Sequence, residues 1–255
     1  TTLFANVSRS SETPTFLELL ANSGANPFLG PDNVVAEPLD NQTAITAEVG
    51  GRGAVAGGEW SLAAYQSWVD DELFTRDALT GGIGITRNAN ARTIHRGLEF
   101  GGQLPVATDL FSQGDRLGIS ATWDWSDFFF DGGPFDGNQI AGIPEHRIQA
   151  RLRYDHPSGA YMQPSVRWLP VDTPTDHANT VDQSSYTVWN LRAGLDGPGW
   201  SVFVEGRNLL DETYASSYLI RDRVPSGPPN AGPEQVTTFI PGSGRSVLAG
   251  FRAEW

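Results

Sequence analysis

Apolar and polar side chains alternate residue by residue along most of this chain. In 146–154 the even-numbered positions are mostly apolar, whereas the odd-numbered ones are Arg147, Gln149, Arg151 and Arg153. A period of two is typical of a β-strand, since successive side chains point to opposite faces. Pro164 lacks the N–H that a central strand donates, so we expect a break or bulge around it. The alternation predicts ten strands, at 2–9, 42–50, 59–69, 92–104, 116–126, 146–154, 160–168, 186–195, 199–208 and 246–255.

The connections between these strands alternate between short and long. The short ones are rich in turn residues and lie at 50–58, 104–115, 156–159 and 196–199. The long ones are polar and lie at 10–41, 70–86, 127–143, 169–185 and 209–243. Antiparallel neighbours therefore place all short turns at one end of the sheet and all long loops at the other. Outer-membrane barrels have this asymmetry, with short periplasmic turns and long outer loops.

All eight tryptophans fall on the apolar side of the alternation, mostly near a strand end. Trp and Tyr gather at membrane interfaces, where an amphipathic ring suits the headgroup layer. No run of about 18 apolar residues predicts a spanning helix. We therefore expect an all-β, antiparallel transmembrane β-barrel in the bacterial outer membrane. The same alternation also fits a soluble β-sandwich that binds carbohydrate through exposed Trp.

Charge and cysteine content narrow the range of partners. The formal net charge is -13, and all 17 basic residues are arginine. A nucleic-acid partner is not expected, because the phosphate backbone requires a basic footprint. The sequence contains no cysteine, so it offers neither disulfides nor thiolate metal ligands.

The titratable residues form no clear catalytic constellation. The four histidines make neither an i,i+4 metal pair nor an HExxH pattern, so an enzyme is not expected. The alternative is a self-contained ten-stranded outer-membrane hydrolase, whose candidate residues are His177 with Asp172 or Asp176. One acidic run is either a calcium site or a solvated loop, and consists of Asp70, Asp71 and Glu72.

Five short motifs follow one another over almost the whole chain. They are Pro14-Thr15 with Glu18-Leu19, Glu48-Val49-Gly50, Gly97-Leu98-Glu99, Asn208-Leu209-Leu210-Asp211-Glu212-Thr213-Tyr214, and Pro241-Gly242-Ser243-Gly244-Arg245-Ser246 before Phe251 and Trp255. In order and spacing they resemble the TonB-dependent outer-membrane receptor family. The final Trp255 is a departure, because Phe is commoner at the end of this family.

The resemblance implies a barrel of roughly 22 strands plugged by an N-terminal domain. Residues 1–255 then correspond to the C-terminal portion of the barrel, without the plug and the other barrel half. The implied function is TonB-dependent import of a metal chelate such as a siderophore, haem or a similar small cofactor. We expect contact with outer-membrane lipid, contact with TonB through the missing part, no covalently bound cofactor, and a ferric chelate as cargo.

Arginines on the polar side of the strands are the candidate cargo site. A guanidinium pairs with carboxylates in a bidentate way and so suits an anionic chelate. The alternative is structural, in which these charges pair with a plug or with Glu48, Glu99, Asp124 and Glu205. The candidate ligand-binding residues are Arg147, Arg151, Arg153, Arg167 and Arg192 on strands, and Tyr214, Arg221 and Arg223 in the last long loop.

Overall fold

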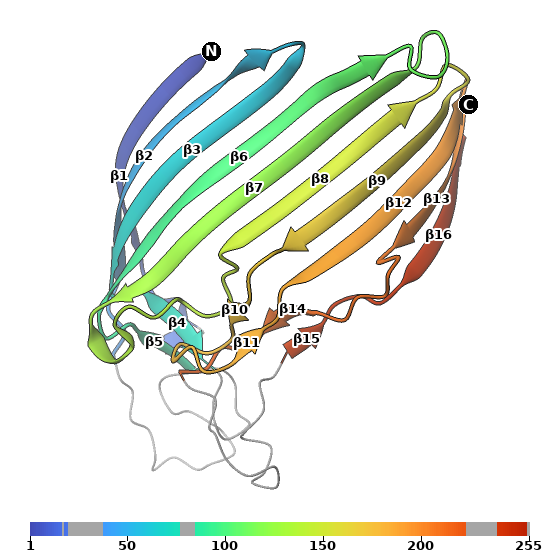
Figure 1. Ribbon diagram of the computed structural model, residues 1–255. Helices are drawn as coiled ribbons and strands as arrows, with labels where there is room; N and C mark the ends of the chain where they lie inside the picture. The colour runs from blue at the N-terminus through green and yellow to red at the C-terminus, as the bar shows by residue number, and fades with distance from the viewer. Residues whose placement is uncertain (17, 20–37, 77–84, 223–238, 254–255) are drawn as a thin grey trace, which may run out of the picture.

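The computed structural model describes residues 1–255 except 17, 20–37, 77–84, 223–238 and 254–255. Its main element is one antiparallel sheet of ten strands (Figure 1). Every predicted strand falls on one of them, which confirms the predicted architecture. In spatial order the strands are β1 (Thr2–Glu12), β2 (Gln42–Val55), β3 (Gly58–Asp70), β6 (Arg92–Thr108), β7 (Arg116–Asp131), β8 (His146–Asp155), β9 (Ala160–Leu169), β12 (Tyr186–Gly197), β13 (Trp200–Arg207) and β16 (Ser246–Ala253).

The long loops contain regular structure that the alternation did not predict. Three two-stranded pieces lie together at the loop end of the sheet (Figure 1). They pair β4 (Leu73–Arg76) with β5 (Ile85–Asn88), β10 (Thr173–Pro174) with β11 (Asp182–Gln183), and β14 (Ala215–Tyr218) with β15 (Phe239–Pro241). A single 3-10 turn, η1 (Gly133–Phe135), follows β7. No helix in the described part of the chain is long and apolar enough to cross a membrane.

Some strands also run further than predicted. β2 continues to Val55, β6 to Thr108 and β7 to Asp131. The predicted turn 50–58 is therefore only the two residues 56–57. These extensions are pairing effects, because each added stretch lies opposite a neighbouring strand.

The strand registers join the apolar positions into one continuous face. Leu62 lies opposite Phe100, and Phe100 lies opposite Trp123 on the next strand. The row continues through Ile148 to Trp168. Because side chains alternate and neighbours are aligned, the same parity holds from one edge of the sheet to the other. The short-turn end of β6 is an exception, because a bulge between Pro105 and Ala107 shifts its register against β7.

Nothing in the described residues covers this apolar face. Val7, Val49 and Val204 lie on it and are 76%, 59% and 52% exposed, respectively. A β-sandwich buries such a face against a second sheet, and here the other strand pairs lie at the loop end. The interpretation as a soluble sandwich is therefore wrong.

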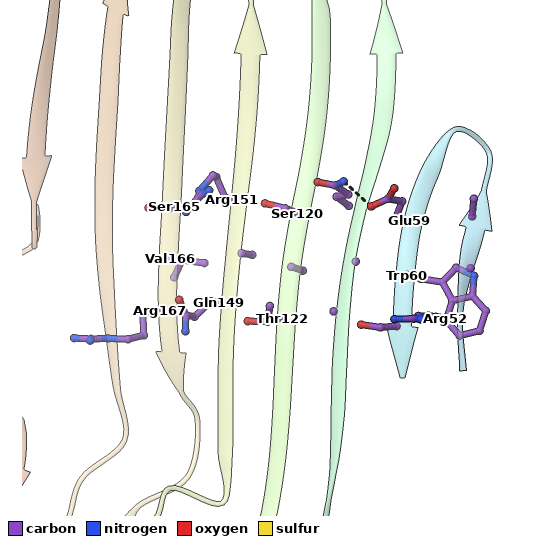
Figure 2. A pocket seen from close by; sticks show the side chains of 18 of the residues that line it. Arg52, Glu59, Trp60, Ser120, Thr122, Gln149, Arg151, Ser165, Val166 and Arg167 are labelled. Carbon is purple, nitrogen blue, oxygen red and sulfur yellow. Dashed lines mark hydrogen bonds between the residues drawn. The ribbon is translucent and has the colours of Figure 1, made fainter. Parts of the chain in front are cut away.

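The opposite face is polar and lines a hollow of about 990 Å³ on the inside of the curved sheet (Figure 2). We call this space the polar hollow. Its walls come from eight of the ten strands, β1 to β12, together with Thr1. Its charged and amide lining residues are Arg52, Glu59, Gln103, Gln149, Arg151, Arg167 and Asn190.

The sheet has two open edges. Among the described residues, β1 pairs only with β2, and β16 pairs only with β13. The ten strands therefore do not form a closed barrel by themselves. The self-contained ten-stranded hydrolase would require such closure. Unpaired backbone groups at an open edge cannot be satisfied in lipid, so further strands must continue the sheet there.

Pro164 opens a small gap in the sheet without shifting its register. It lies opposite Leu191 on the β12 side. On the β8 side, ladder pairs stop at Ser165 and resume at Met162 with the same register. The missing N–H therefore removes hydrogen bonding locally, as expected, and no bulge forms.

The turn between β6 and β7 is organised by one carboxylate. Asp115 is fully buried, and its oxygens accept hydrogen bonds from the backbone N–H groups of Leu110, Phe111 and Ser112 at 2.8–3.0 Å. The Tyr154 hydroxyl donates a further bond at 3.0 Å. Burial raises the pKa of Asp115, but these donors outweigh it and lower the pKa to about 2.

We expect Ala121→Arg and Thr122→Arg to differ in their effect on stability. By strand parity the Ala121 side chain shares the apolar face with Trp123, whereas the Thr122 side chain has the opposite parity and belongs to the polar face that lines the hollow. A charge facing lipid costs about 2–4 kcal/mol near the bilayer midplane, whereas one in the hollow stays hydrated. Urea unfolding of the full-length protein in lipid vesicles measures the difference. Equal losses for the two variants would contradict the assignment of faces.

Acid should loosen the β6–β7 turn. The folded-state pKa of Asp115 lies near 2, below its ordinary 3.8, so its stabilisation is present above pH 4. It is lost as pH falls from about 4 through 2. The hydrogen-exchange protection factor of the peptide spanning 109–115, which divides out the intrinsic pH dependence of exchange, should therefore fall over this range. In Asp115→Asn, which lacks the charge, the protection factor should be low throughout, and a protection factor that still changes with pH there would contradict the mechanism.

Candidate functional site

A second cavity, of about 490 Å³, lies where β8, β9 and β12 meet the long loops. We call it the outer pocket. Arg147 and Arg167 enter it from β8 and β9, and Tyr186 and Tyr218 enter it from β12 and β14. The remaining walls are formed by residues 141–144 and 215–217 together with Gln149, Leu169, Thr173 and Ile220. Two cations and two phenol rings thus face one space.

Arg167 lies against a pair of stacked tyrosines. Its guanidinium carbon is 4.9 Å from the ring centre of Tyr214 and 5.8 Å from that of Tyr186. The two rings are 4.7 Å apart and nearly parallel, at 19°. Cation–π attraction and stacking hold the guanidinium plane in one orientation. Arg167 Nε is buried and has no hydrogen-bond partner in the described structure.

Tyr218 closes the pocket on the loop side. Its hydroxyl donates to Gln183 Oε1 at 2.7 Å, and the Ala215 N–H donates to the same oxygen at 3.1 Å. Burial raises the pKa of Tyr218 to about 12, and nearby Tyr186 adds to this effect. The phenol is therefore a neutral donor at physiological pH.

Two of the sequence motifs, 208–214 and 241–246, are joined by hydrogen bonds next to Tyr214. The buried Asn208 side chain donates to the carbonyls of Glu212 and Ser243, at 2.8 Å and 3.0 Å, and accepts from the Glu212 N–H at 2.8 Å. Asp211 accepts from the Arg245 N–H at 2.9 Å. The motifs 208–214 and 241–246 are thus one structural unit that positions Tyr214.

Gly242 is required by the close approach of Tyr214. A Cβ on Gly242 would lie 2.2 Å from the tyrosine ring. The Gly242 N–H also donates to the Tyr214 carbonyl at 2.7 Å. A larger residue would therefore push the ring out of its stack with Tyr186.

Arg167 connects the outer pocket with the polar hollow, because it lines both. In Figure 2, Arg167, Gln149 and Arg151 follow one another along the wall of the hollow. Within the described residues, no carboxylate lies within 4.0 Å of Arg147, Arg151 or Arg167. These three arginines therefore form an unneutralised cationic track from the outer pocket inwards.

The other predicted arginines lie in different settings. Arg153 pairs with Asp155 at 2.8 Å and Arg192 with Glu205 at 3.5 Å, both toward the short-turn end. Arg221 is buried in the loop layer, where its carbonyl accepts from the His177 N–H. Arg223 lies outside the described residues.

The candidate residues predicted from the sequence include Tyr214 but neither Tyr186 nor Tyr218, which both line the outer pocket. Tyr186 is the first residue of its strand, and Tyr218 lies in a short strand without alternation. The signal available in the sequence was the concentration of tyrosines around the motif 208–214. It could not indicate which rings share a cavity.

His177 is placed for packing, not for reaction with a substrate. It is 1% exposed, and its ring centre lies 5.0 Å from that of Phe74, 5.1 Å from Phe130 and 6.0 Å from Phe135. Its Nδ1 accepts from the Ala141 N–H at 3.4 Å. The proposed hydrolase would need this ring at a surface that substrate can reach.

The acidic residues of the run 70–72 pair with different basic residues. Asp70 pairs with Arg92 at 2.8 Å, and Glu72 pairs with His95 at 3.0 Å. Across the described ranges, no group of three or more His, Asp or Glu residues is arranged to hold a metal ion. These residues therefore hold the base of the β3–β6 loop.

The chain matches the model of the family described as TonB dependent receptor-like, beta-barrel, over residues 1–209, and it belongs to that family. The family consists of outer-membrane transport receptors and not of enzymes, which confirms the predicted class and location. The apolar face of the sheet therefore meets lipid.

Solved structures share the fold. The ferric yersiniabactin uptake receptor FyuA from Yersinia pestis has a TM-score of 0.67 and 17% identity, over 99% of this chain and 35% of that one. The copper transporter OprC has a TM-score of 0.71 and 14% identity, over 99% and 37%. The ferric citrate transporter FecA has a TM-score of 0.69 and 17% identity, over 98% and 35%. The chain thus spans about a third of the length of these structures.

Replacing Asn208 should release Tyr214. Asn208→Ala removes three side-chain hydrogen bonds and places alanine at a positive φ of 47°. Leaving buried partners unsatisfied costs about 1–3 kcal/mol. We expect faster hydrogen exchange in 209–214, with little change for Asn6→Ala, whose residue is exposed on β1. Unchanged exchange in 209–214 would contradict the role of Asn208.

Proposed function

We propose that the protein is a receptor that imports an anionic metal chelate, such as a siderophore complex or haem, in a TonB-dependent way. In this proposal, residues 1–255 form the C-terminal part of the barrel wall. Further strands continue the sheet at β1 and β16, and a plug with its contact to TonB lies outside these residues. The family match supports the class of protein. The open edges support a larger barrel.

The observation that carries the cargo assignment is the set of unpaired arginines at the loop end. Long loops of outer-membrane barrels face the exterior, so the outer pocket lies at the end of the sheet from which a ligand arrives. Arg147 and Arg167 have no carboxylate within 4.0 Å among the described residues. A ligand carboxylate, phenolate or hydroxamate oxygen would supply the missing partner, with a strong charge-assisted hydrogen bond.

The tyrosines give the pocket a second preference. The pocket is lined by Tyr186, whose ring stacks on Tyr214, and by the neutral phenol of Tyr218. Aromatic groups on a chelate can stack on such rings and gain burial at little entropic cost. The combination favours a ligand that is both anionic and partly planar. Two of the similar structures are a ferric yersiniabactin uptake receptor and a ferric citrate transporter, so both of those proteins handle a ferric chelate.

Arg151 extends the same chemistry into the polar hollow. It lies two residues from Gln149, which lines both spaces, and opposite Ser165 across the strand pair. We infer that cargo passes from the outer pocket along Arg167 toward Arg151. The arginines with acidic partners, Arg153 and Arg192, then have structural roles in the wall.

Charge removal in the outer pocket tests the proposal. We expect Arg147→Gln and Arg167→Gln each to weaken binding of a ferric chelate by about tenfold or more, since a charge-assisted hydrogen bond contributes about 1.5–3 kcal/mol. Fluorescence quenching of the full-length protein by ferric citrate, ferric catecholates and haem gives the affinities. Arg116→Gln, at the short-turn end of β7, is the matched control.

Two outcomes would overturn the proposal. One is binding of every tested chelate with the same affinity by the wild type and both pocket variants. The other is equal weakening by Arg116→Gln, which would indicate a nonspecific effect of net charge.

A further inference from the structure

The turn between β6 and β7 differs from the other short turns of the sheet. It has seven residues, 109–115, whereas the turns after β2, β8 and β12 have two, four and two. It also exposes large apolar side chains. Phe111 is 81% exposed and Leu110 is 46% exposed. In a turn surrounded by water, two such neighbours would be unfavourable.

These side chains are held in place by the turn itself. The Asp115 carboxylate accepts from the N–H groups of both Leu110 and Phe111, at 2.8 Å. At the other end of the turn, the Gly114 N–H donates to Asp109 Oδ1 at 2.5 Å. Asp109 and Gly114 both have positive φ, 57° and 87°. The backbone that carries Leu110 and Phe111 is therefore preorganised, which lowers the entropic cost of binding.

The turn adjoins the lipid-facing side of the sheet. The Phe111 ring lies edge-to-face against Tyr154, with ring centres 5.7 Å apart at 73°. Tyr154 has the outward parity, because it lies opposite Leu117 and Met162 on the apolar face. Phe111 thus extends that face beyond the end of β8, at the same end of the sheet as Trp60 and Trp200.

We propose that Leu110 and Phe111 form a membrane anchor that inserts into the lipid headgroup and upper acyl region on the short-turn side of the membrane. Lipid is the occupant because the apolar face with which Phe111 is continuous already meets lipid. Large apolar and aromatic side chains are favoured at this boundary. The rigid turn fixes the depth at which the β6–β7 end of the wall sits. The inference rests on the outer-membrane location and is independent of the cargo.

The absence of cysteine from the chain allows a direct test. Phe111→Cys and Leu110→Cys are labelled with the fluorophore NBD in the full-length protein, reconstituted in vesicles of phosphatidylethanolamine and phosphatidylglycerol. Ser158→Cys is the control, because Ser158 is exposed on the adjoining turn. The two turns nearly touch, since a Cβ on Gly114 would lie 3.4 Å from Pro157.

We expect spin-labelled lipids, with the nitroxide at the headgroup or at a shallow acyl position, to quench NBD at 111 and 110 at least threefold more than at 158. Iodide in the buffer should show the reverse order. Equal quenching at all three positions, with full access to iodide, would overturn the proposal. So would an NBD signal that becomes protected only in native outer-membrane vesicles, because this would indicate a protein partner.

Folding of each variant is checked by heat-modifiable migration in gels. If Phe111→Cys fails to fold, Leu110→Cys alone carries the test. An additional change, Asp115→Asn, removes the carboxylate that holds both N–H groups. It should lower lipid quenching at position 110 and leave position 158 unchanged. If Asp115→Asn leaves lipid quenching at position 110 unchanged, the rigidity of the turn does not contribute to insertion.

Discussion

The structure depends on the pairing of backbone N–H and C=O groups between neighbouring strands. In lipid no water is available to satisfy these groups, so a spanning strand must pair along both of its sides. An antiparallel ladder, which keeps its register across the gap at Pro164, then aligns the side chains of ten strands by parity. One face carries Leu62, Phe100 and Ile148 into lipid, and the other gathers charges around the polar hollow. Both surfaces follow from one pattern of hydrogen bonds.

At the loop end, the separation of an apolar face from a polar face is combined with packing of the long loops against one another. The loop layer has its own core, in which His177 and Phe130 are 1% and 3% exposed. That core and the Asn208 hydrogen bonds fix where Tyr186, Tyr214 and Tyr218 lie relative to Arg167. The outer pocket is therefore assembled from the strands of the wall and from loops that pack on one another. The short-turn end has no such layer, and there Asp115 organises a single turn.

The sequence predicted the ten long strands because alternation is a local signal that each strand carries by itself. It failed where structure depends on pairing. The ends of β2, β6 and β7 extend because a neighbour lies opposite them. The short pairs such as β10 with β11 have two residues per strand, too few to show any period. Pro164 was recognised as a disturbance, but only the registers distinguish a gap from a bulge.

For the site, the sequence alone determined which residue types face the interior. Arg147, Arg151, Arg153, Arg167 and Arg192 share that parity, and nothing local separates them. The tertiary structure decided that Arg153 and Arg192 meet carboxylates while the other three meet none among the described residues. The reason is that the neighbour of a strand residue is set by register across the sheet and by folding of distant loops. Parity is encoded within a strand, whereas partners are encoded between strands.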